Sequence, residues 1–472
     1  MTIRGFEIRR PNAPGLGAIA MGVWCATVAL MPSTTARLLL VIPLVLAPLF
    51  YWVILLPSRW LLAFFFCLLL LPPLPLPLGN SGVHVAPLLA LLGVVTGVVW
   101  MREWRSLSHP LTLALVIFTG VLLESLAFAA LYSGWEIAIG SLARVVLFAI
   151  SVFVFLYSYA GPGSDSSGPF RITKVLFGLA VAGALFACAD FYYQFPVPGG
   201  YGDQFVYLEE GVFRRAQGLF YEASTLGNFC AFFLVMAMVC LFRQRQETPF
   251  SRAWLQLGGV VLAAALLFSY SRASVLNVVV AAAVLASIHA GRVRRSLLVL
   301  LAALVAAGVA IQLAAPRLSA NYWGRLLGSF SFFDQSPDQV LSGRLSHWQV
   351  LYDFLAREPW YAVFGIGYKT LPYSNFVGSK VIADNTYLGL LVETGVAGLA
   401  VFIALNIVIL RTGWIARSSP RPQAQFFGEW IFCFWCGQLV QMLSGDLITY
   451  WRVLPVYFWV LGTAARLARE DA

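Results

Sequence analysis

Residues 110–132, PLTLALVIFTGVLLESLAFAALY, and residues 137–159, IAIGSLARVVLFAISVFVFLYSY, decide the fold of this chain. Each stretch is almost wholly apolar and carries one ionisable side chain, Glu124 in the first and Arg144 in the second. A helix needs about 20 apolar residues to cross a bilayer. The two stretches therefore predict consecutive transmembrane helices joined by a short connection at 133–136.

Twelve further apolar blocks have the same character. They run approximately over 16–32, 36–56, 59–78, 86–101, 172–194, 224–242, 253–270, 272–291, 297–315, 384–410, 426–446 and 451–467. The sequence thus predicts an all-α polytopic membrane protein of about 14 transmembrane helices. Hydrophobic residues make up 60% of the chain and charged residues 11%. This balance excludes an ordinary soluble protein, in which about a quarter of residues are charged.

The formal net charge of +10 reflects membrane topology, because the basic residues lie in short clusters between apolar blocks. If the N-terminus is cytoplasmic, most of them fall on the inner side, and outer connections such as 79–85 and 133–136 hold none. Cytoplasmic segments of membrane proteins carry the excess of Lys and Arg. We therefore predict that both termini are cytoplasmic, and nucleic acid is not an expected partner.

Two outward segments are long, at 195–223 and 316–383. Long loops in compact proteins are functional or disordered, and the aromatic residues and helical patterns of these two predict order. The chain is thereby divided into helices 1 to 11 at 1–315, a large loop at 316–383 and helices 12 to 14 at 384–472. Outward arginines run against the inside bias and so point to an anionic ligand. They are Arg214, Arg215, Arg317, Arg325, Arg344 and Arg357.

Two short outward patches carry candidate site residues. The first, RRAQGLFYEAS at 214–224, places two arginines and the carboxylate of Glu222 just before a helix. The second, Ser271-Arg272-Ala273, lies at a turn between two predicted helices. The fork of an arginine side chain matches phosphate oxygens. We therefore favour a phosphate ligand for Arg272 over a side chain that merely reaches the membrane surface.

The third patch is the long loop, in which we predict a helix from Ser336-Pro337 to Pro359. Four residues at helical spacing form an apolar stripe on this helix, namely Leu345, Trp348, Tyr352 and Leu355. Arg344 and His347 lie side by side at the edge of this stripe. After this helix come Gly365-Ile366-Gly367-Tyr368, then Asp384-Asn385-Thr386-Tyr387 at the start of the next apolar block, and Glu393-Thr394-Gly395.

Ionisable residues at bilayer depth are costly and are paired or functional. Glu124 and Arg144 lie at equal depth in adjacent helices, which predicts a structural ion pair. Asp190, near the outer end of its helix, either lines an outer cavity or sits at the membrane interface. Glu393 is expected to be a structural buried acid, because it faces roughly away from Asp384 on the same helix.

Taken together, the patches described above resemble the bacterial O-antigen ligase/polymerase superfamily. The resemblance lies in an ordered set of patterns over about 215–400. The set is R-x-x-G-x-F from Arg215 to Phe220, S-R at Ser271-Arg272, S-G-R…W…P…G-x-G from Ser342 to Gly367, and D-N-x-Y-L…E-T-G from Asp384 to Gly395. Each pattern alone is weak. The first 170 residues are similar to the family only in being helical membrane segments.

This resemblance implies an inverting, metal-independent glycosyltransferase without a cofactor, acting at a large, partly helical periplasmic loop before helix 12 in a bacterial inner membrane. Its glycan donor is carried on undecaprenyl diphosphate, and its acceptor is lipid A–core for ligases or another lipid-linked glycan for polymerases. A chain-length regulator is a further expected partner. Residues matching Arg215 and Arg272 hold the diphosphate in the family, and we expect Arg214, Arg344, Asn385 and Tyr387 to bind substrate beside them.

One departure concerns the catalytic base. O-antigen ligases carry His-Asn where this chain has Asp384-Asn385. Three side chains are therefore candidates for the base, namely Asp384, Glu222 and His347, and helix capping is the alternative for Asp384. The missing histidine favours a polysaccharide polymerase, with an O-antigen ligase as the alternative.

Two other classes of protein fit the composition. A lipid-linked oligosaccharide flippase also has many helices, but carriers place polar sites near the midplane in repeated halves. A cell-wall glycosyltransferase of the shape, elongation and division type also combines many helices with a large outer loop. A metal site is not expected from His84, His109, His289 and His347, which are far apart in sequence. The seven cysteines all fall in apolar blocks, so no disulfides are expected.

Overall fold

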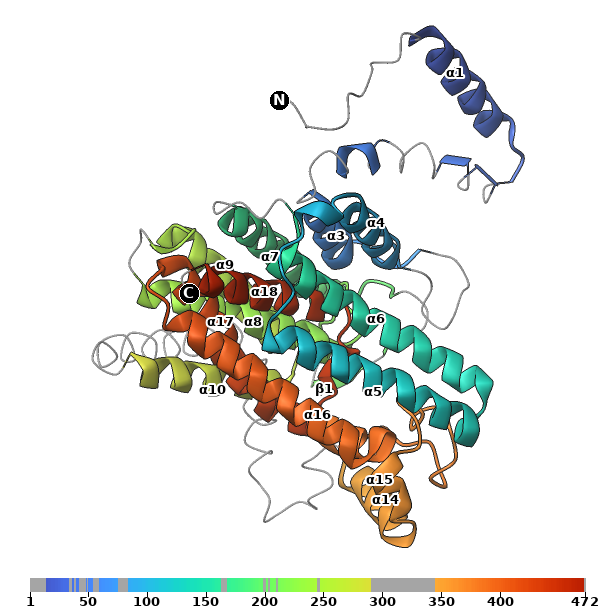
Figure 1. Ribbon diagram of the computed structural model, residues 1–472, viewed down its shortest axis with the longest axis vertical. Helices are drawn as coiled ribbons and strands as arrows, with labels where there is room; N and C mark the ends of the chain where they lie inside the picture. Colours follow the sequence, from blue (N-terminus) through green and yellow to red (C-terminus); the bar gives the residue numbers. More distant parts are fainter. Residues whose placement is uncertain are drawn as a thin grey trace. The chain divides into compact units, whose positions relative to one another are not determined.

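The computed structural model describes residues 14–33, 36–37, 40–41, 48, 50–53, 59–74, 84–162, 168–197, 201–202, 204–208, 211–243, 247–289 and 344–470. At 14–20, 207 and 208 it describes the backbone alone. The chain divides into two compact units, Met1–Arg59 and Trp60–Ala472 (Figure 1).

The first unit contains helix α1 (Pro14–Leu30), which coincides with the first apolar block. Beyond the helix, Arg37 Nε donates to the Met31 carbonyl at 2.6 Å. The indole nitrogen of Trp24 donates to the Leu40 carbonyl at 2.9 Å. These bonds tie the following segment to α1. The second predicted block, 36–56, lies partly outside the described residues.

The second unit is built almost wholly from helices. They are α3 (Arg59–Leu70), α4 (Ala86–Val99), α5 (Pro110–Ser133), α6 (Trp135–Ala160), α7 (Gly168–Tyr193), α8 (Ala223–Phe242), α9 (Arg252–Phe268), α10 (Arg272–Ile288), α14 (Arg344–Arg357), α15 (Trp360–Phe364), α16 (Thr386–Arg417), α17 (Pro422–Gln441) and α18 (Leu454–Arg469). Single 3-10 turns are η1 (Met101–Glu103), η3 (Met442–Ser444) and η4 (Leu447–Thr449).

Helices α5, α6, α7, α8 and α16 are long and apolar enough to cross a membrane, and α3, α4, α9 and α10 are shorter apolar helices. The chain is therefore a multi-pass, predominantly α-helical membrane protein. The number of fourteen crossings stays a prediction, because the block at 297–315 lies outside the described residues.

Two connections on the side predicted to face outward, below called the outward side, are now defined. Residues 269–271 separate α9 from α10, as the sequence predicts. The loop before α8 forms a small antiparallel hairpin of β1 (Phe205–Leu208) and β2 (Gly211–Arg214), in which Phe205 pairs with Arg214. The hydrophobic pattern does not predict this hairpin, because its strands are only four residues long.

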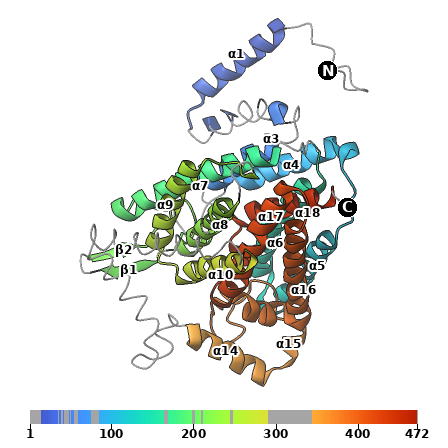
Figure 2. The same cartoon turned by 90° about the vertical axis from the view of Figure 1, so that its left-hand side faces the viewer.

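Helix α8 lies at the centre of the second unit, and 83% of its apolar stretch is buried (Figure 2). The Phe232 ring on this helix lies 4.5 Å from Trp430 of α17 and 4.3 Å from Tyr457 of α18. Helix α18 also packs closely on α6, since a Cβ at Gly462 would lie 2.1 Å from the Ser158 hydroxyl. Small residues permit such close helix contacts in membranes.

A buried amide network joins α8, α10, α17 and α18. The Asn228 amide of α8 donates to Gln438 at 2.6 Å and to Gln441 at 2.8 Å, and the Asn277 amide of α10 donates to the same two oxygens. The Tyr457 hydroxyl donates to Asn228 at 2.6 Å. Polar side chains hydrogen-bond across helices where no water is available. The network fixes the helix ends that carry the site described below.

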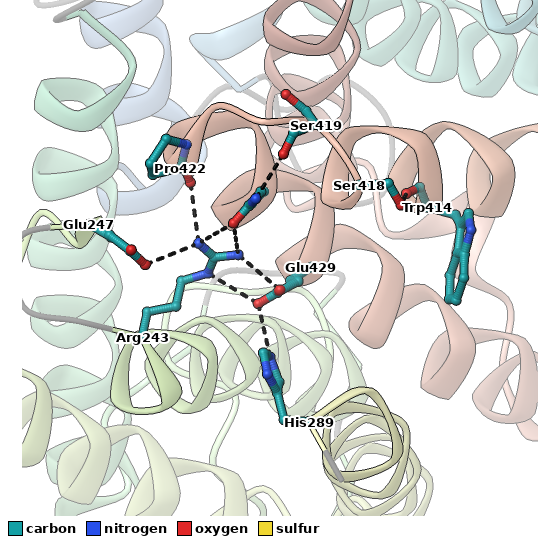
Figure 3. Close-up of polar contacts among 9 residues, drawn as sticks. Arg243, Glu247, His289, Trp414, Ser418, Ser419, Pro422 and Glu429 are labelled. Carbon is teal, nitrogen blue, oxygen red and sulfur yellow. Dashed lines mark hydrogen bonds and ion pairs between the residues drawn. The ribbon is translucent and has the colours of Figure 1, made fainter. Parts of the chain in front are cut away.

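A second polar cluster lies at the opposite end of these helices, the end predicted to be cytoplasmic (Figure 3). Arg243, just after α8, pairs with Glu429 of α17 at 2.8 Å, and both side chains are only 5% exposed. His289, just after α10, lies 3.4 Å from the other oxygen of Glu429, and Gln425 accepts from both terminal guanidinium nitrogens of Arg243. This cluster clamps α8, α10 and α17 together.

Breaking the cluster is expected to destabilise the fold. Glu429→Ala leaves the Arg243 guanidinium buried without its carboxylate, which costs about 3–5 kcal/mol when one member of a buried pair is removed. We expect a clear fall in the melting temperature of the purified protein in detergent. Glu247→Ala is the matched control, because this weaker partner lies 3.5 Å away and is 32% exposed. Equal melting temperatures for the two variants would contradict the structural role of Glu429.

Candidate active site

The predicted diphosphate arginines lie at the end of the second unit that is predicted to face outward, on two segments that contact each other. The Arg215 backbone N–H donates to the Gln204 carbonyl at 2.8 Å, and the next N–H, of Ala216, donates to Phe268 at 2.9 Å. The Arg215 side chain donates through Nε to the Ser269 carbonyl at 2.8 Å. Arg272 opens α10 three residues later. The structure thus brings these two arginines to the same turn.

Arg214 has a different environment from Arg215. It is buried, pairs with Asp190 at 2.6 Å and donates to the Phe195 carbonyl at 2.7 Å. The other Asp190 oxygen accepts the Gly218 N–H at 3.3 Å. Through these bonds, Asp190 anchors the loop that carries Arg214 and Gly218. Arg214 thus has structural partners of its own, and its binding of substrate stays a prediction.

Glu222 lies directly before α8 and contributes a carboxyl to the same end. It makes no side-chain cap bond to the helix and instead accepts the Ser224 hydroxyl at 2.6 Å. Burial raises the pKa of this carboxyl. The Ser224 bond and the charges of Arg215 and Lys369 lower the pKa, while the charge of Asp384 raises it. Glu222 and Asp384 therefore act on one another electrostatically.

Asp384 is held in an unusual conformation at the end of the long loop. Its φ angle is +43°, and its carboxylate lies 3.3 Å from Nε of Arg344, the first residue of α14. The side chain remains 44% exposed. Asn385, not Asp384, caps α16 by accepting the N–H groups of residues 387 and 388 at 3.0 Å. Capping is therefore excluded as the role of Asp384.

The other predicted residues of this region are placed around Asp384. The cap bonds occupy the side-chain oxygen Oδ1 of Asn385, and the Tyr387 hydroxyl donates to the Leu439 carbonyl at 3.1 Å. His347 lies one turn after Arg344 on α14 and is partly buried. Trp348, beside it, donates to the Ala383 carbonyl at 2.6 Å and so fixes the backbone next to Asp384.

The long loop packs as a small apolar core around α14. Its buried members are Leu351, Ile366, Leu371, Val377, Val381 and Val392, with Val350, Phe354 and Leu355 packed against them. The predicted stripe is therefore partly wrong, because Tyr352 is 71% exposed and Leu351 is buried. The buried face of α14 is therefore rotated from the predicted one, because the loop residues after α15 pack against Leu351. The predicted helix start at Ser336-Pro337 lies outside the described residues.

Two of the glycine patterns have a steric explanation. Helix α16 is kinked at Gly395, whose φ is +71° and whose Cβ would lie 2.2 Å from the Val363 carbonyl. Gly367 has φ +108° and would place a Cβ 2.4 Å from the backbone of Ala129 on α5. Its N–H donates to the Glu393 carbonyl at 2.9 Å. Only glycine fits these positions without strain. The two glycines therefore allow the loop to pack closely against α5 and α16.

Sequence reasoning missed Lys369. It is buried, has φ +56° and forms an ion pair with Asp446. Burial lowers the pKa of Lys369, while Glu393, Asp384 and Glu222 raise it. The buried Glu393 carboxyl also accepts the Leu371 N–H at 3.4 Å, which supports its predicted structural role. A lone lysine in a turn of the sequence gives no signal for such a position.

The predicted ion pair between Glu124 and Arg144 is wrong. Glu124 is exposed, and the Arg144 guanidinium lies 4.4 Å from the ring centroid of Tyr373. Equal depth on adjacent helices does not fix the direction in which side chains point. Arg144 is instead a second missed cation of the outward end, because its charge acts on Tyr221 and Lys369.

Arg452 is a third missed residue. It is buried directly before α18 and donates to the carbonyls of Leu68, Leu71 and Leu219. Burial lowers the pKa of Arg452 to about 10. By holding the Leu219 carbonyl, this arginine positions the segment that leads to Glu222. Its sequence context, a single basic residue before an apolar block, looks like any other membrane-flanking arginine.

Backbone strain is concentrated at this end. In the described part of the chain, the non-glycine residues with positive φ are Gln194, Tyr270, Lys369 and Asp384. All four belong to the outward connections that carry Arg214, Arg272 and the loop. Strained backbone persists where the surrounding structure enforces it and clusters at functional sites. Among the same described residues, no group of three or more His, Cys, Asp or Glu side chains lies together as metal ligands would.

The fold and the site define a multi-pass α-helical membrane protein with clustered arginines and carboxylates at one end. Residues 257–403 match the family of O-antigen ligases, and this match supports the resemblance of the chain to the O-antigen ligase/polymerase superfamily. The matched segment contains Arg272, Arg344 and Asp384 but not Arg215 or Glu222. Members of this family are membrane glycosyltransferases and ligases. A search among curated proteins gave no significant match.

Proposed function

We propose that the chain is an inverting glycosyltransferase that moves a glycan from undecaprenyl diphosphate to an acceptor glycan at the periplasmic face of a bacterial inner membrane. The observation that carries this proposal is that the Arg215 side chain bonds to the turn before Arg272 and interacts electrostatically with Glu222, on which the charge of Asp384 also acts. The family match supports glycosyl transfer. The product we propose is a polymerised polysaccharide.

The arginines serve the leaving group. When the bond between the anomeric carbon and the diphosphate breaks, both electrons pass to the diphosphate oxygen, which gains negative charge. Fixed guanidinium groups stabilise this charge more in the transition state than in the ground state. Arg215 is suited to this task because its Nε bond to Ser269 fixes the side chain. Arg272 is anchored on the following helix.

Asp384 serves the acceptor. Its carboxylate takes the proton of the acceptor hydroxyl as that oxygen attacks the anomeric carbon from the face opposite the diphosphate, which inverts the configuration. Three observations favour Asp384 over Glu222 as this base. Its side chain is 44% exposed, its orientation is set by Arg344, and it is not used for capping. His347 has no comparable contact with the carboxylates among the described residues.

The raised pKa of Glu222 predicts how glycan-donor binding depends on pH. As pH rises through this pKa, Glu222 gains a negative charge beside the proposed diphosphate site and weakens the binding of the anionic glycan donor. The KM for this substrate should therefore rise with pH in the wild type and rise less in Glu222→Gln. In Ser224→Ala the rise should begin at higher pH, because the Ser224 bond lowers the pKa of Glu222. Identical profiles for all three proteins would contradict this account.

The match to the O-antigen ligase family supports a second candidate for the acceptor substrate, namely lipid A–core. The departure at Asp384-Asn385 from the His-Asn pattern favours the polymerase. The deciding experiment uses purified protein in detergent with a lipid-diphosphate-linked repeat unit as the only glycan substrate. A ladder of longer glycans supports the polymerase. Product that appears only after addition of lipid A–core identifies a ligase.

A transporter predicts a different outcome. The purified protein would then form no new glycosidic bond with either acceptor. In a deletion strain, single lipid-linked repeats would accumulate on the cytoplasmic face for a flippase and on the periplasmic face for a polymerase. Accumulation on the cytoplasmic face alone would overturn the proposed glycosyltransferase.

A further inference from the structure

Tyr201 and Tyr221 form an aromatic pair next to Glu222. Their ring centroids lie 5.5 Å apart at an interplanar angle of 60°. The two segments are tied by a bond from the Gly202 N–H to the Tyr221 carbonyl at 3.1 Å. The Tyr201 hydroxyl lies 3.5 Å from Nη1 of Arg452. The pair is therefore held rigidly, yet Tyr221 remains 41% exposed.

Tyr373 is a third fixed and exposed ring at this end. It lies in a turn closed by its own N–H, which donates to the Thr370 carbonyl at 3.0 Å. The Arg144 guanidinium covers one ring face at 4.4 Å, and 43% of the residue stays exposed. Rigid, partly exposed aromatic residues lose little conformational entropy when a ligand binds to them.

The three rings share one neighbourhood with the carboxyl of Glu222. Burial raises the pKa of Tyr221, the charges of Tyr373 and Glu222 raise it further, and Arg144 opposes the rise. These electrostatic interactions place Tyr221, Tyr373, Arg144 and Glu222 at the same end of the second unit, where the Arg144 guanidinium contacts the Tyr373 ring. The exposed aromatic surface is thus bordered by a carboxyl and a guanidinium.

Interfacial tyrosines of a membrane protein look different. Tyr192 and Tyr193, at the end of α7, are 75% and 67% exposed, and their rings contact each other at 5.1 Å. Tyr193 also stacks on Phe195 at 5.7 Å. Such aromatic groups suit the headgroup region of a bilayer. By contrast, Tyr221 and Tyr373 lie beside charged groups of the site. A lipid acyl chain cannot form hydrogen bonds with these groups.

A sugar ring matches this mixed surface. One face of a pyranose exposes C–H groups that pack on an aromatic ring, while its hydroxyls hydrogen-bond to carboxylate and guanidinium groups at the edge. Binding sites for small polar ligands combine aromatic walls with a few such polar groups. We propose that Tyr201, Tyr221 and Tyr373 form an aromatic subsite that binds sugar rings of the acceptor glycan next to Glu222. The acceptor assignment rests on the proposed function.

The test measures saccharide binding apart from transfer. The probe is the oligosaccharide released by mild acid from the polysaccharide of the strain that encodes the chain. Saturation-transfer NMR on the full-length protein in detergent should show transfer to sugar C–H protons. Tyr221→Ala and Tyr373→Ala should each weaken binding roughly tenfold, the scale of one lost aromatic contact. Tyr221→Phe and Tyr373→Phe should retain binding, and Tyr192→Ala is the matched control for an exposed tyrosine outside the subsite.

Undecaprenyl diphosphate binding is measured on the same variants, because a merely structural role would lower both affinities together. Unchanged saccharide affinity in both alanine variants, or a parallel loss of both ligands, overturns the aromatic subsite. If the wild type binds the oligosaccharide through these rings but makes no product in the transfer assay, the proposed function fails while the subsite stands. If transfer occurs and the alanine variants keep the wild-type saccharide affinity, the subsite fails alone.

Discussion

Asp384→Asn is expected to lower the kcat of glycan transfer by about 10²- to 10⁴-fold, the usual contribution of a general base. Asparagine suits this test because it tolerates the positive φ of residue 384 and retains the size of the side chain. The variant loses the proton acceptor but keeps the backbone. Initial rates at saturating lipid-linked substrate measure the effect, and undecaprenyl diphosphate affinity should stay close to the wild-type value.

The matched control for this variant is Glu358→Gln, which neutralises an exposed carboxylate directly after α14. It should transfer glycan at the wild-type rate. A rate for Asp384→Asn near that of the wild type would remove Asp384 from the mechanism. The base would then have to be sought in Glu222 or His347.

Arg272→Ala is expected to lower kcat/KM by about 10²- to 10³-fold, because one fixed group that stabilises developing charge is lost. Arg272→Lys should recover only part of the loss, since an ammonium cannot form the two parallel bonds that a guanidinium makes to phosphate. The control is Arg252→Ala, which removes the exposed arginine that opens the preceding helix, α9. Its activity should equal that of the wild type.

The same measurements separate catalysis from binding. If Arg272 stabilises charge mainly in the transition state, kcat and kcat/KM fall together in Arg272→Ala. A rise in KM with unchanged kcat would show that the residue binds the diphosphate equally in ground and transition states. Equal activity of Arg272→Ala and Arg252→Ala would contradict the role of Arg272 altogether.

The membrane fold follows from the sequence because bilayer thickness sets a length that apolar blocks must reach. Blocks such as 110–132 and 172–194 reappear as α5 and α7 with boundaries shifted by a few residues. The turn at Ser269–Ser271 was visible from the polar residues that interrupt two apolar stretches. The amide network of Asn228 and Gln438 could not be foreseen, because long-range hydrogen bonds leave no periodic pattern.

A short sequence pattern predicts the placement of candidate residues where the pattern carries its own geometry. Arg272 opens α10, and the Arg215 side chain bonds to the turn just before this helix. Where side-chain direction decides the partner, the sequence misled, since Arg214 turns to Asp190 and Arg144 to Tyr373. The spacing of the apolar residues in α14 also does not predict which face of this helix the rest of the loop covers.

The missed residues have a common cause. Lys369, Arg144 and Arg452 each reach the site from a different part of the chain. None has a neighbour of related chemistry within a few positions, so only the fold brings them together. Asp384 is a candidate because of its place in a pattern, but only the structure shows that Asn385, and not Asp384, caps the helix.

The proposed glycosyl transfer depends on guanidinium groups that hold a lipid diphosphate at the outward end of the helices. The most direct measurement is the equilibrium affinity of undecaprenyl diphosphate for the purified wild type and for the Arg215→Ala/Arg272→Ala double variant, at matched melting temperature. We predict measurable binding to the wild type and a loss of at least about 100-fold in the double variant, on the scale of two charge-assisted contacts. Equal affinities of a folded double variant and the wild type would contradict the account.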